Sequence, residues 1–292
     1  MKKSLGERVF DLFNGLFMVF ISVVCLYPVI YVLFASLSDS NKLLAHSGFL
    51  LKPVGFCTDA YKEVMKNPMV FSGFFNSVYY VVAGTVINML LTIMGAYALS
   101  RRKLWIKKYI NLGVVFTMFF SGGLIPTFLL VKNIGLYDSR MALILPSAIA
   151  TYNFIVMRTA FASCPESLEE AAKIDGANDF RILFQIILPV TKATVSVIVL
   201  FYAVQHWNDW FQASIYLRSR NKYPIQLYLR EVLINSSTDS MMSNSGGGQD
   251  ALAISESIKY ATVMVSTAPI LVVYPFLQKY FVKGVMVGSV KG

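Results

Sequence analysis

Long runs of uncharged residues are the feature that most constrains the fold of this 292-residue chain. A helix needs about 20 residues to cross the hydrocarbon layer of a membrane, which is roughly 30 Å thick. Runs near that length lie at 15–37, 70–100, 109–131, 141–157 and 260–278, and a sixth, from 182 to about 217, is apolar but contains Lys192, His206 and Asp209. Only 14% of the residues are charged, whereas soluble domains carry about 25%. The sequence therefore predicts an integral membrane protein with six spans.

The apolar runs are continuous rather than alternating, which favours helices over a closed barrel, the two structures that satisfy the backbone in lipid. We therefore expect an all-α membrane protein that forms a single transmembrane domain over residues 1–292. Its spans are expected at about 10–38, 70–100, 109–131, 139–161, 183–214 and 259–281. A polar loop at 163–182 joins the fourth span to the fifth, and an outer loop at 215–258 joins the fifth to the sixth.

Lysine and arginine residues gather at three places that fall on one side of a six-span protein. The clusters are Lys2, Lys3 and Arg8; Arg101, Arg102, Lys103, Lys107 and Lys108; and Lys279, Lys283 and Lys291. Cytoplasmic loops carry the excess of Lys and Arg in membrane proteins, so we expect a multi-pass protein of the cytoplasmic membrane with both termini in the cytoplasm. The net charge of +10 is then mostly an orientation signal, and nucleic acid is not an expected partner.

Residues that carry catalytic or metal chemistry are sparse. The three cysteines, Cys25, Cys57 and Cys164, are spaced for neither a disulfide framework nor a metal site. The chain also lacks the phosphate-binding motif GxxxxGK followed by Ser or Thr. We therefore expect no catalytic residue, no metal and no cofactor in this chain, and the sequence predicts a protein that is not itself an enzyme.

The polar segment between the fourth and fifth spans predicts a helix–turn–helix elbow. Ser163 and Glu166 have the spacing of a capping box, and the helix they begin should run through Ile174. Gly176 suits the left-handed residue after a helix, and Asn178 can cap a second helix. The residues available for a contact face are Leu168, Ala171, Ala172 and Ile174. The same pattern also fits an amphipathic connector that lies on the membrane surface.

Three segments resemble one family. The string Glu170-Ala171-Ala172, then Gly176, Ile186 and Leu188-Pro189, matches the EAA loop of permease subunits in binding-protein-dependent ABC importers: EAA, three residues, Gly, nine residues, then I-x-L-P. The C-terminal segment 283–292 and the Trp207-Asn208-Asp209-Trp210 string resemble the smaller permease of maltose-type carbohydrate importers. The charged outer-loop segments and the Ser/Gly tract resemble the subgroup that imports complex or acidic oligosaccharides.

This resemblance implies the type I ABC importer permease fold, with six transmembrane helices and a cytoplasmic coupling helix. It implies a permease subunit of an ATP-driven importer that translocates an oligosaccharide, delivered by an extracytoplasmic binding protein, across the cytoplasmic membrane. The implied partners are a second, non-identical permease, a dimer of ATPase subunits, the solute-binding protein and membrane lipid. ATP and Mg would be bound by the partner ATPase.

The resemblance also implies roles for residues of the elbow. Glu170 would pair with a basic group on the ATPase or brace the elbow, and Ala171 and Ala172 would pack into a cleft of the ATPase. Gly176 would form the turn. The remaining coupling residues implied by the motif are Asp175, Leu188 and Pro189.

Two further segments receive roles from the same resemblance. The tail would reach along the ATPase dimer interface, through Gly284, Gly288, Lys291 and Gly292. The third outer loop would probe the binding protein, through Ser240, Gly246, Gly247 and Gly248. The glycine-rich sequence of that loop equally suits a plain flexible loop.

Four residues in or near the spans form a possible substrate path: Tyr152, Asn153, Trp207 and Asn208. Aromatic rings can stack on sugars and amides can hydrogen-bond to them, although aromatic residues also serve as routine membrane anchors. In maltose-type systems the partner permease makes most of the substrate contacts, so direct contact by this chain stays open.

Three alternatives compete with a sugar permease. An ABC permease for a non-sugar solute shares the elbow but not the tail. A secondary transporter is expected to hold buried carboxylates for ion coupling, whereas the spans here have only Asp11 and Asp209 near their ends. A scaffold protein would use the elbow to bind a partner without transport. The sequence leaves the sugar, its length and its charge open.

Overall fold

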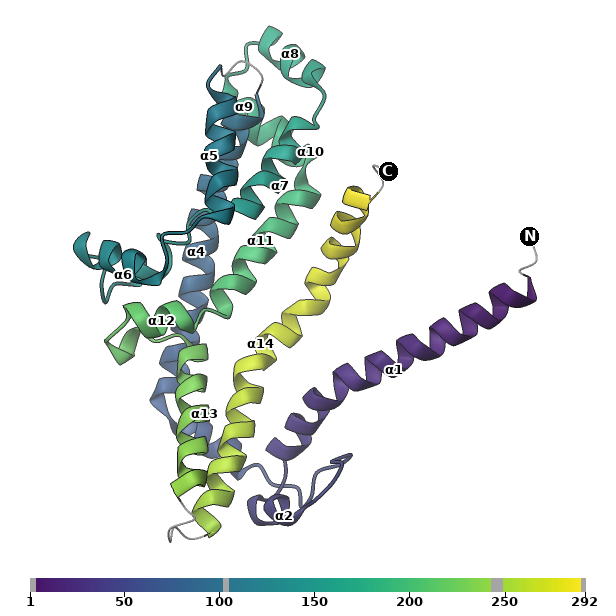
Figure 1. Ribbon diagram of the computed structural model, residues 1–292, viewed down its shortest axis with the longest axis vertical. Coiled ribbons are helices and arrows are strands. Elements are labelled where there is room, and N and C mark those ends of the chain that lie inside the picture. The colour runs from purple at the N-terminus through teal and green to yellow at the C-terminus, as the bar shows by residue number, and fades with distance from the viewer. Residues whose placement is uncertain (1–3, 102–104, 243–248, 290–292) are drawn as a thin grey trace. The chain divides into compact units, whose positions relative to one another are not determined.

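The structure is a computed structural model that describes residues 4–101, 105–242 and 249–289, with the side chains of 236–253, 274 and 276–289 left out of the description. The described residues form helices and no strand, apart from one isolated bridge between Ser38 and Phe56. The elements (Figure 1) are α1 Leu5–Ser36, α2 Ser40–Ala45, α3 Asp59–Lys66, α4 Pro68–Ser100, α5 Lys107–Phe119, α6 Leu124–Asn133, η1 Arg140–Leu143, α7 Thr151–Ala162, α8 Glu166–Ile174, α9 Asp179–Ile182, η2 Leu183–Ile187, α10 Leu188–Val190, α11 Lys192–Trp207, α12 Phe211–Tyr216, η3 Arg220–Lys222, α13 Ile225–Met242 and α14 Gln249–Ser289. The predicted all-α class is confirmed.

The apolar helices differ in length from the predicted spans. Among the described residues, α1, α4 and residues 254–273 of α14 are long and apolar enough to cross a membrane. Two bent pairs raise that number to five if each pair is one span: α5 with α6, bent by 114°, and 179–190 with α11, bent by 89°. The predicted span at 139–161 forms the 3-10 helix η1 and the 12-residue helix α7. The six-span count therefore stays a prediction.

Backbone chemistry explains the first of these bends. Gly123, at the start of α6, has φ +85°, a left-handed conformation that interrupts a right-handed helix and that glycine adopts at little cost. Hydropathy detects the apolar run at 109–131 but not the glycine that divides it.

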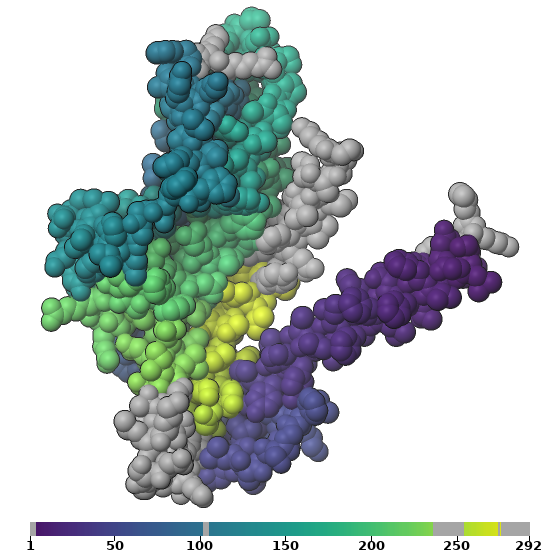
Figure 2. Space-filling model, viewed as in Figure 1, coloured from purple at the N-terminus to yellow at the C-terminus, as the bar shows by residue number. Residues whose placement is uncertain are grey.

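The described chain divides into two compact units, and the first comprises 1–70 and 229–269. Its core is small: Ala35, Leu43 and Leu50, with Tyr31, Phe34, Val54 and Tyr260 packed around them. Along α1, which Figure 2 draws in purple, only Ala35 and Ser36 are buried. The apolar surface of α1 is suited to lipid or to another membrane subunit.

The second unit comprises 71–228 and 270–292. In it α7 packs against both α5 and α11. The larger core of this unit joins α4, α7, α8, α9, η2 and α11. Its buried residues are Met89, Ile93, Ala96, Tyr97, Leu99, Phe154, Met157, Phe161, Cys164, Ala172, Ile182, Leu183, Ile187, Ile198 and Tyr202. A single core therefore connects the polar elbow to the long helices.

Buried polar groups tie α4 to α11 in the second unit. The Asn88 amide lies 3.1 Å from His206 Nε2, and the Thr92 hydroxyl lies 2.8 Å from the Tyr202 hydroxyl. A methyl group at Gly84 would collide with the His206 ring, so glycine is what lets the two helices approach here. Polar residues within membrane helices normally face the bundle interior, and His206 has such a packing role.

Candidate functional site

The elbow at 163–182 contains the most organised polar site of the second unit. Helix α8 ends in a Schellman motif, in which Gly176 N–H donates to the Lys173 carbonyl at 3.0 Å and Ala177 N–H donates to the Ala172 carbonyl at 2.9 Å. Gly176 has φ +78°, as the sequence predicted. Asn178 then caps α9 by accepting from Arg181 N–H at 2.8 Å, which confirms that prediction too.

The predicted start of α8 is wrong. Helix α8 begins at Glu166 with Pro165 at the N-cap position, and no side chain caps it. Ser163 instead ends α7, and its hydroxyl donates to the Ala160 carbonyl at 2.8 Å. The capping-box pattern failed because the preceding helix runs on to Ala162 and uses the serine for its own last turn.

Arg101 clamps α8 to the rest of the unit. It follows the end of α4, and its guanidinium forms an ion pair with Glu169 of α8. The same guanidinium donates to the Phe161 carbonyl at 3.0 Å and lies 4.8 Å from the centre of the Tyr97 ring. The Arg101 and Glu169 side chains are only 18% and 13% exposed. We call these residues, Tyr97, Arg101, Phe161 and Glu169, the Arg101 clamp.

Electrostatics keep the Glu169 carboxylate ionised. Burial would raise the pKa of Glu169, but hydrogen bonds from Lys173 and Arg101 and the charges of both hold that pKa below its usual range. The Lys173 ammonium lies 2.8 Å from Glu169 Oε1 and 3.7 Å from Asp179 Oδ1. The hydrogen bond to Glu169 raises the pKa of Lys173 in turn. The Arg101 clamp therefore joins α8 to α4 through charged groups at neutral pH, and Lys173 extends this network to Asp179 of α9.

The other face of α8 is open. Ile174 is 87% exposed, and Leu168, Glu170 and Ala171 are exposed too. Glu170 has no ion pair within the part of the chain that the structure describes, unlike Glu169 one position earlier. Figure 1 places α8 at one end of the second unit, near the ends of α5 and α9. This open, partly apolar face is suited to receive another protein.

Ala172 departs from the predicted contact face. It is 8% exposed and packs in the large core of its own unit. Helical geometry explains the difference, because Ala172 follows Glu169 by three residues and so lies on the same face of α8, the face that Arg101 holds against the rest of the unit. Ala172 thus attaches the elbow to the core in this conformation, while Ala171 remains on the open face.

Leu188 and Pro189 anchor the second half of the elbow. They form α10, directly after the π-helical turn η2. Ile182 and Ile187 are fully buried, and Leu188 packs against the same core. Proline has no N–H to continue a helix, and the 89° bend follows after Val190. Movement of α8 would therefore act on the helix that continues as α11.

The predicted substrate-path residues divide into exposed and buried pairs. Tyr152 is 57% exposed on α7, and Asn208 is exposed with its amide bonded to the Val204 carbonyl at 2.9 Å. Asn153 and Trp207 are 5% and 8% exposed. The centre of the Trp207 ring lies 6.1 Å from that of Phe74, and its buried indole N–H has no hydrogen-bond partner within the described residues. This conformation offers Tyr152 and Asn208 to a ligand, and keeps the other two inside the unit.

The two remaining predicted sites fall mostly beyond what the structure describes. Ser240 belongs to α13, whereas Gly246, Gly247 and Gly248 lie outside the described residues. Gly284 and Gly288 belong to α14, whereas Lys291 and Gly292 lie outside the described residues. The roles given to these residues remain predictions.

Asp138 forms a second polar centre that sequence reasoning missed. Its carboxylate accepts from the backbone N–H groups of Arg218 and Ser219, each at 3.0 Å, and from the Ser219 hydroxyl at 2.5 Å. The Lys222 ammonium lies 3.2 Å away. These hydrogen bonds, led by that from the Ser219 hydroxyl, hold the pKa of Asp138 well below its usual range. Asp138 thereby fixes the segment between α12 and α13. The sequence around Asp138 gave no sign of this role, because its partners Arg218 and Ser219 are 80 and 81 positions away.

Comparisons with known proteins identify the family of the chain. The model of the family described as "Binding-protein-dependent transport system inner membrane component" matches residues 4–287. The chain is 43% identical to the polygalacturonan/rhamnogalacturonan transport system permease protein YtcP of Bacillus subtilis (strain 168), over 98% of this chain and 99% of that protein. It is 39% identical to the protein LplC of the same organism, over 100% of this chain and 98% of that one.

A solved structure resembles the fold over the same length. It belongs to a bacterial ABC transporter involved in the import of the acidic polysaccharide alginate, and superposes with a TM-score of 0.86 at 31% identity, covering 96% of this chain and 99% of that one. A second structure, of a bacterial alginate ABC transporter in complex with a periplasmic protein bound to alginate pentasaccharide, has a TM-score of 0.57 at 16% identity. The second match supports the fold alone.

Proposed function

The chain belongs to the family of inner-membrane components of binding-protein-dependent transport systems, and from this premise we propose that it moves an acidic oligosaccharide across the cytoplasmic membrane. As a carbohydrate importer permease it is a translocation subunit of an ABC transporter, with a type I permease fold. The acidic character of the cargo is supported by two relatives, whose names give polygalacturonan or rhamnogalacturonan and alginate as their substrates.

The braced elbow is the observation that carries the mechanism. Helix α8 exposes Glu170 and Ile174 on one face, while the Arg101 clamp holds its other face. A helix that must transmit force needs this combination, since a partner can push only on an element that does not yield locally. We assign α8 as the coupling helix that docks on a separate ATPase.

Partners follow from what the chain lacks and what it exposes. The sequence has no phosphate-binding GxxxxGK motif, so ATP and Mg belong to a dimer of ATPase subunits. The chain has one elbow, whereas the proposed ATPase has two subunits, so a second, non-identical permease is proposed to supply the other elbow and complete the pore. The solute-binding protein of the proposed system delivers the oligosaccharide from outside; a solved alginate transporter is in complex with a periplasmic protein that is bound to alginate pentasaccharide.

The positions of lysine and arginine residues support an orientation of the protein in the membrane. Lys107 and Lys108 begin α5 and Arg101 follows α4, at the end of the second unit that also carries α8 (Figure 1). Lys- and Arg-rich loops stay in the cytoplasm, so this end, the elbow and both termini are proposed to be cytoplasmic. The ends of α1 at Ser36 and of α4 at Pro68 are then outside.

Two connections would carry the movement of a docked α8 to the membrane helices: the Arg101 clamp and the buried segment at 182–188. ATP binding closes the ATPase dimer and brings the two elbows together. The Arg101 clamp passes the movement of α8 to α4, and the buried segment at 182–188 passes it to α11. Nucleotide shifts the inward–outward equilibrium only as far as its affinities for the two states differ.

Transport by the reconstituted complex tests this function. Proteoliposomes that contain this chain, its co-purifying permease and ATPase should take up uronic-acid oligosaccharides when ATP is inside and the binding protein outside. Neutral oligosaccharides of equal length serve as the matched cargo. Equal uptake of both would reject the acidic specificity, and uptake that continues without ATP would reject the importer in favour of a secondary carrier.

A further inference from the structure

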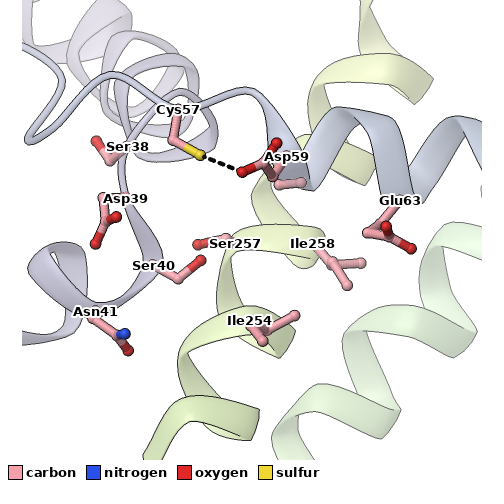
Figure 3. A pocket seen from close by; sticks show the side chains of 11 residues that line it. Ser38, Asp39, Ser40, Asn41, Cys57, Asp59, Glu63, Ile254, Ser257 and Ile258 are labelled. Atoms are coloured by element: carbon pink, nitrogen blue, oxygen red, sulfur yellow. Dashed lines mark hydrogen bonds between the residues drawn. The ribbon is translucent and has the colours of Figure 1, made fainter.

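A pocket in the first unit is the strongest site that the coupling mechanism does not use. It has a volume of about 290 Å³ and lies between the segment after α1, the start of α3 and one turn of α14 (Figure 3). Its lining residues are Ser38, Asp39, Ser40, Asn41, Cys57, Asp59, Ala60, Glu63, Ile254, Ser257 and Ile258. All belong to one unit, so its shape does not depend on how the two units are placed. We call it the outer pocket.

The outer pocket has an acidic lining. Asp39, Asp59 and Glu63 contribute to it, and no lysine, arginine or histidine is among the lining residues that the structure describes. Two of these carboxylates are already paired, Asp59 with Lys62 at 2.8 Å and Glu63 with Lys66 at 2.6 Å, through lysine side chains that are about 70% exposed. Asp39 uses one oxygen to cap α2 at Lys42 N–H, at 3.1 Å, and has no ion pair within the described part of the chain.

A buried hydroxyl adds an independent sign that the outer pocket takes a ligand. Ser257 is 1% exposed, and its hydroxyl has no hydrogen-bond partner among the residues that the structure describes. In Figure 3 that hydroxyl points from α14 toward the segment that carries Ser40. An unmet hydroxyl in a protein interior is destabilising, and a donor group that entered the pocket would relieve this. The pocket thus presents acceptors without donors of positive charge.

The chemistry of the lining selects the occupant. Metal binding does not fit, since no group of three or more His, Cys, Asp or Glu in the described chain has suitable geometry. An acidic oligosaccharide would be repelled by the carboxylates, and the volume lies just below the roughly 300–1,000 Å³ of sites for whole small molecules. Ile254 and Ile258 offer an apolar wall of the kind that covers the methylene stem of lysine or arginine.

We propose that the outer pocket receives a lysine or arginine side chain of the extracytoplasmic solute-binding protein, with Asp39 and Ser257 as its recognition residues. This assignment rests on the proposed function for the orientation of the pocket and for the partner. A charged side chain that enters an acidic pocket steers the encounter and fixes its register. The binding protein would thereby contact the segment that follows the C-terminal end of α1 and the N-terminal part of α14.

Cys57 is a built-in reporter, because it lines the outer pocket and its thiol donates to Asp59 Oδ2 at 3.2 Å. The experiment measures its modification by membrane-impermeant methanethiosulfonates of equal size, one cationic and one anionic, in proteoliposomes of the whole transporter. The cationic reagent should react about tenfold faster or more, as acidic clefts concentrate cations to that degree. Addition of the binding protein should slow both reactions at least about fivefold.

Two variants and a matched control sharpen this test. Asp39→Asn keeps the helix cap, since Asn and Asp cap equally well, but should remove most of the charge preference and weaken stimulation by the binding protein. Glu256→Gln removes one carboxylate of α14 that pairs with Lys259 and does not line the pocket, and should leave both unchanged. Ser257→Ala should weaken stimulation without lowering thermal stability, whereas a merely structural hydroxyl would lower stability. Cys57→Ser identifies modification at other cysteines.

The possible results distinguish a failure of the pocket proposal from a failure of the proposed transport function. Equal rates with the two reagents would overturn the acidic recognition site. A cationic preference with no protection by the binding protein would overturn the partner assignment. Wild-type uptake in the same vesicles reports the proposed function separately, so a failure of transport is not mistaken for a failure of the pocket.

Discussion

At the scale of single residues, the Arg101–Glu169 pair is the contact on which the elbow depends most. Loss of one partner leaves the other charge largely buried, which costs about 1–3 kcal/mol. Arg101→Glu and Glu169→Arg should each lower ATP-driven uptake and uncouple it from ATP hydrolysis. The exchanged pair, with both changes, should recover part of the coupling. The ratio of uptake to hydrolysis in proteoliposomes measures this.

The control for that exchange is Lys173→Gln. Lys173 also contacts Glu169, but its side chain is 41% exposed, and exposed ion pairs contribute only about 0–1 kcal/mol. It should reduce coupling far less than Arg101→Glu. Equal effects of the two changes, or an exchanged pair no better than either single variant, would contradict the clamp.

Asp138 predicts how stability depends on pH. Its pKa is lowered in the folded chain from the usual value of 3.8, because the Ser219 hydroxyl and nearby N–H groups bond to the ionised form. A lowered folded pKa adds stability that is complete above about pH 5 and is lost as the pH falls through 3.8 and below. Asp138→Asn should therefore lower the thermal midpoint by a constant amount between about pH 7 and pH 5. Below about pH 5 the difference from wild type should shrink, and a difference that grew instead would refute the assignment.

Local chemistry decided which residues could be predicted from sequence. Gly176 and Asn178 were predictable because each position acts on its own backbone or on a neighbour within three residues. Arg101 was predicted only as an orientation signal, since its partner Glu169 is 68 positions away. Ala172 was placed on the wrong face because the motif identifies the helix but not which side packs inward.

At the scale of elements, the turn after α8 should tolerate only glycine well. Gly176→Ala puts a side chain at φ +78°, which costs about 1–2 kcal/mol. The change should weaken retention of the ATPase during purification in mild detergent. Gly113→Ala is the matched control, since Gly113 lies within α5 and an added methyl group meets nothing within 4 Å.

The two glycine variants should have opposite effects on local stability, since Gly176→Ala destabilises the turn and Gly113→Ala stabilises its helix. Gly113→Ala should leave ATPase retention unchanged and favour the helix slightly, by about 0.5–1 kcal/mol. Retention lost equally in both variants, or kept fully in Gly176→Ala, would mean that the turn does not set the position of α8.

The long straight helices were predicted more accurately than the short or bent ones, for a physical reason. Hydropathy reports whether a segment is apolar, and so it located α1 and α4 closely. It does not report where the backbone turns, and therefore missed the division of 109–131 into α5 and α6 and the short α7 within 139–161. The glycine at the first break is visible in the sequence, although its conformation is not.

At the scale of the whole molecule, the elbow motif and the apolar runs together were enough to predict the family. The motif is short and sits in one loop, yet the family match covers residues 4–287. The outer pocket was not predictable, because it brings together residues from 38–63 and from 254–258, which no motif links. Long-range packing of this kind appears only in the folded chain.

The central claim is that the open face of α8 docks on the ATPase, and photo-cross-linking tests it most directly. A photoreactive aromatic residue in place of Ile174, which is 87% exposed, should form an adduct with the ATPase subunit in the assembled transporter. The same residue in place of Val272, 65% exposed in the apolar part of α14, should not. An ATPase adduct from position 174 alone is the predicted result. No such adduct in a complex that still transports, or equal adducts from both positions, would contradict the account.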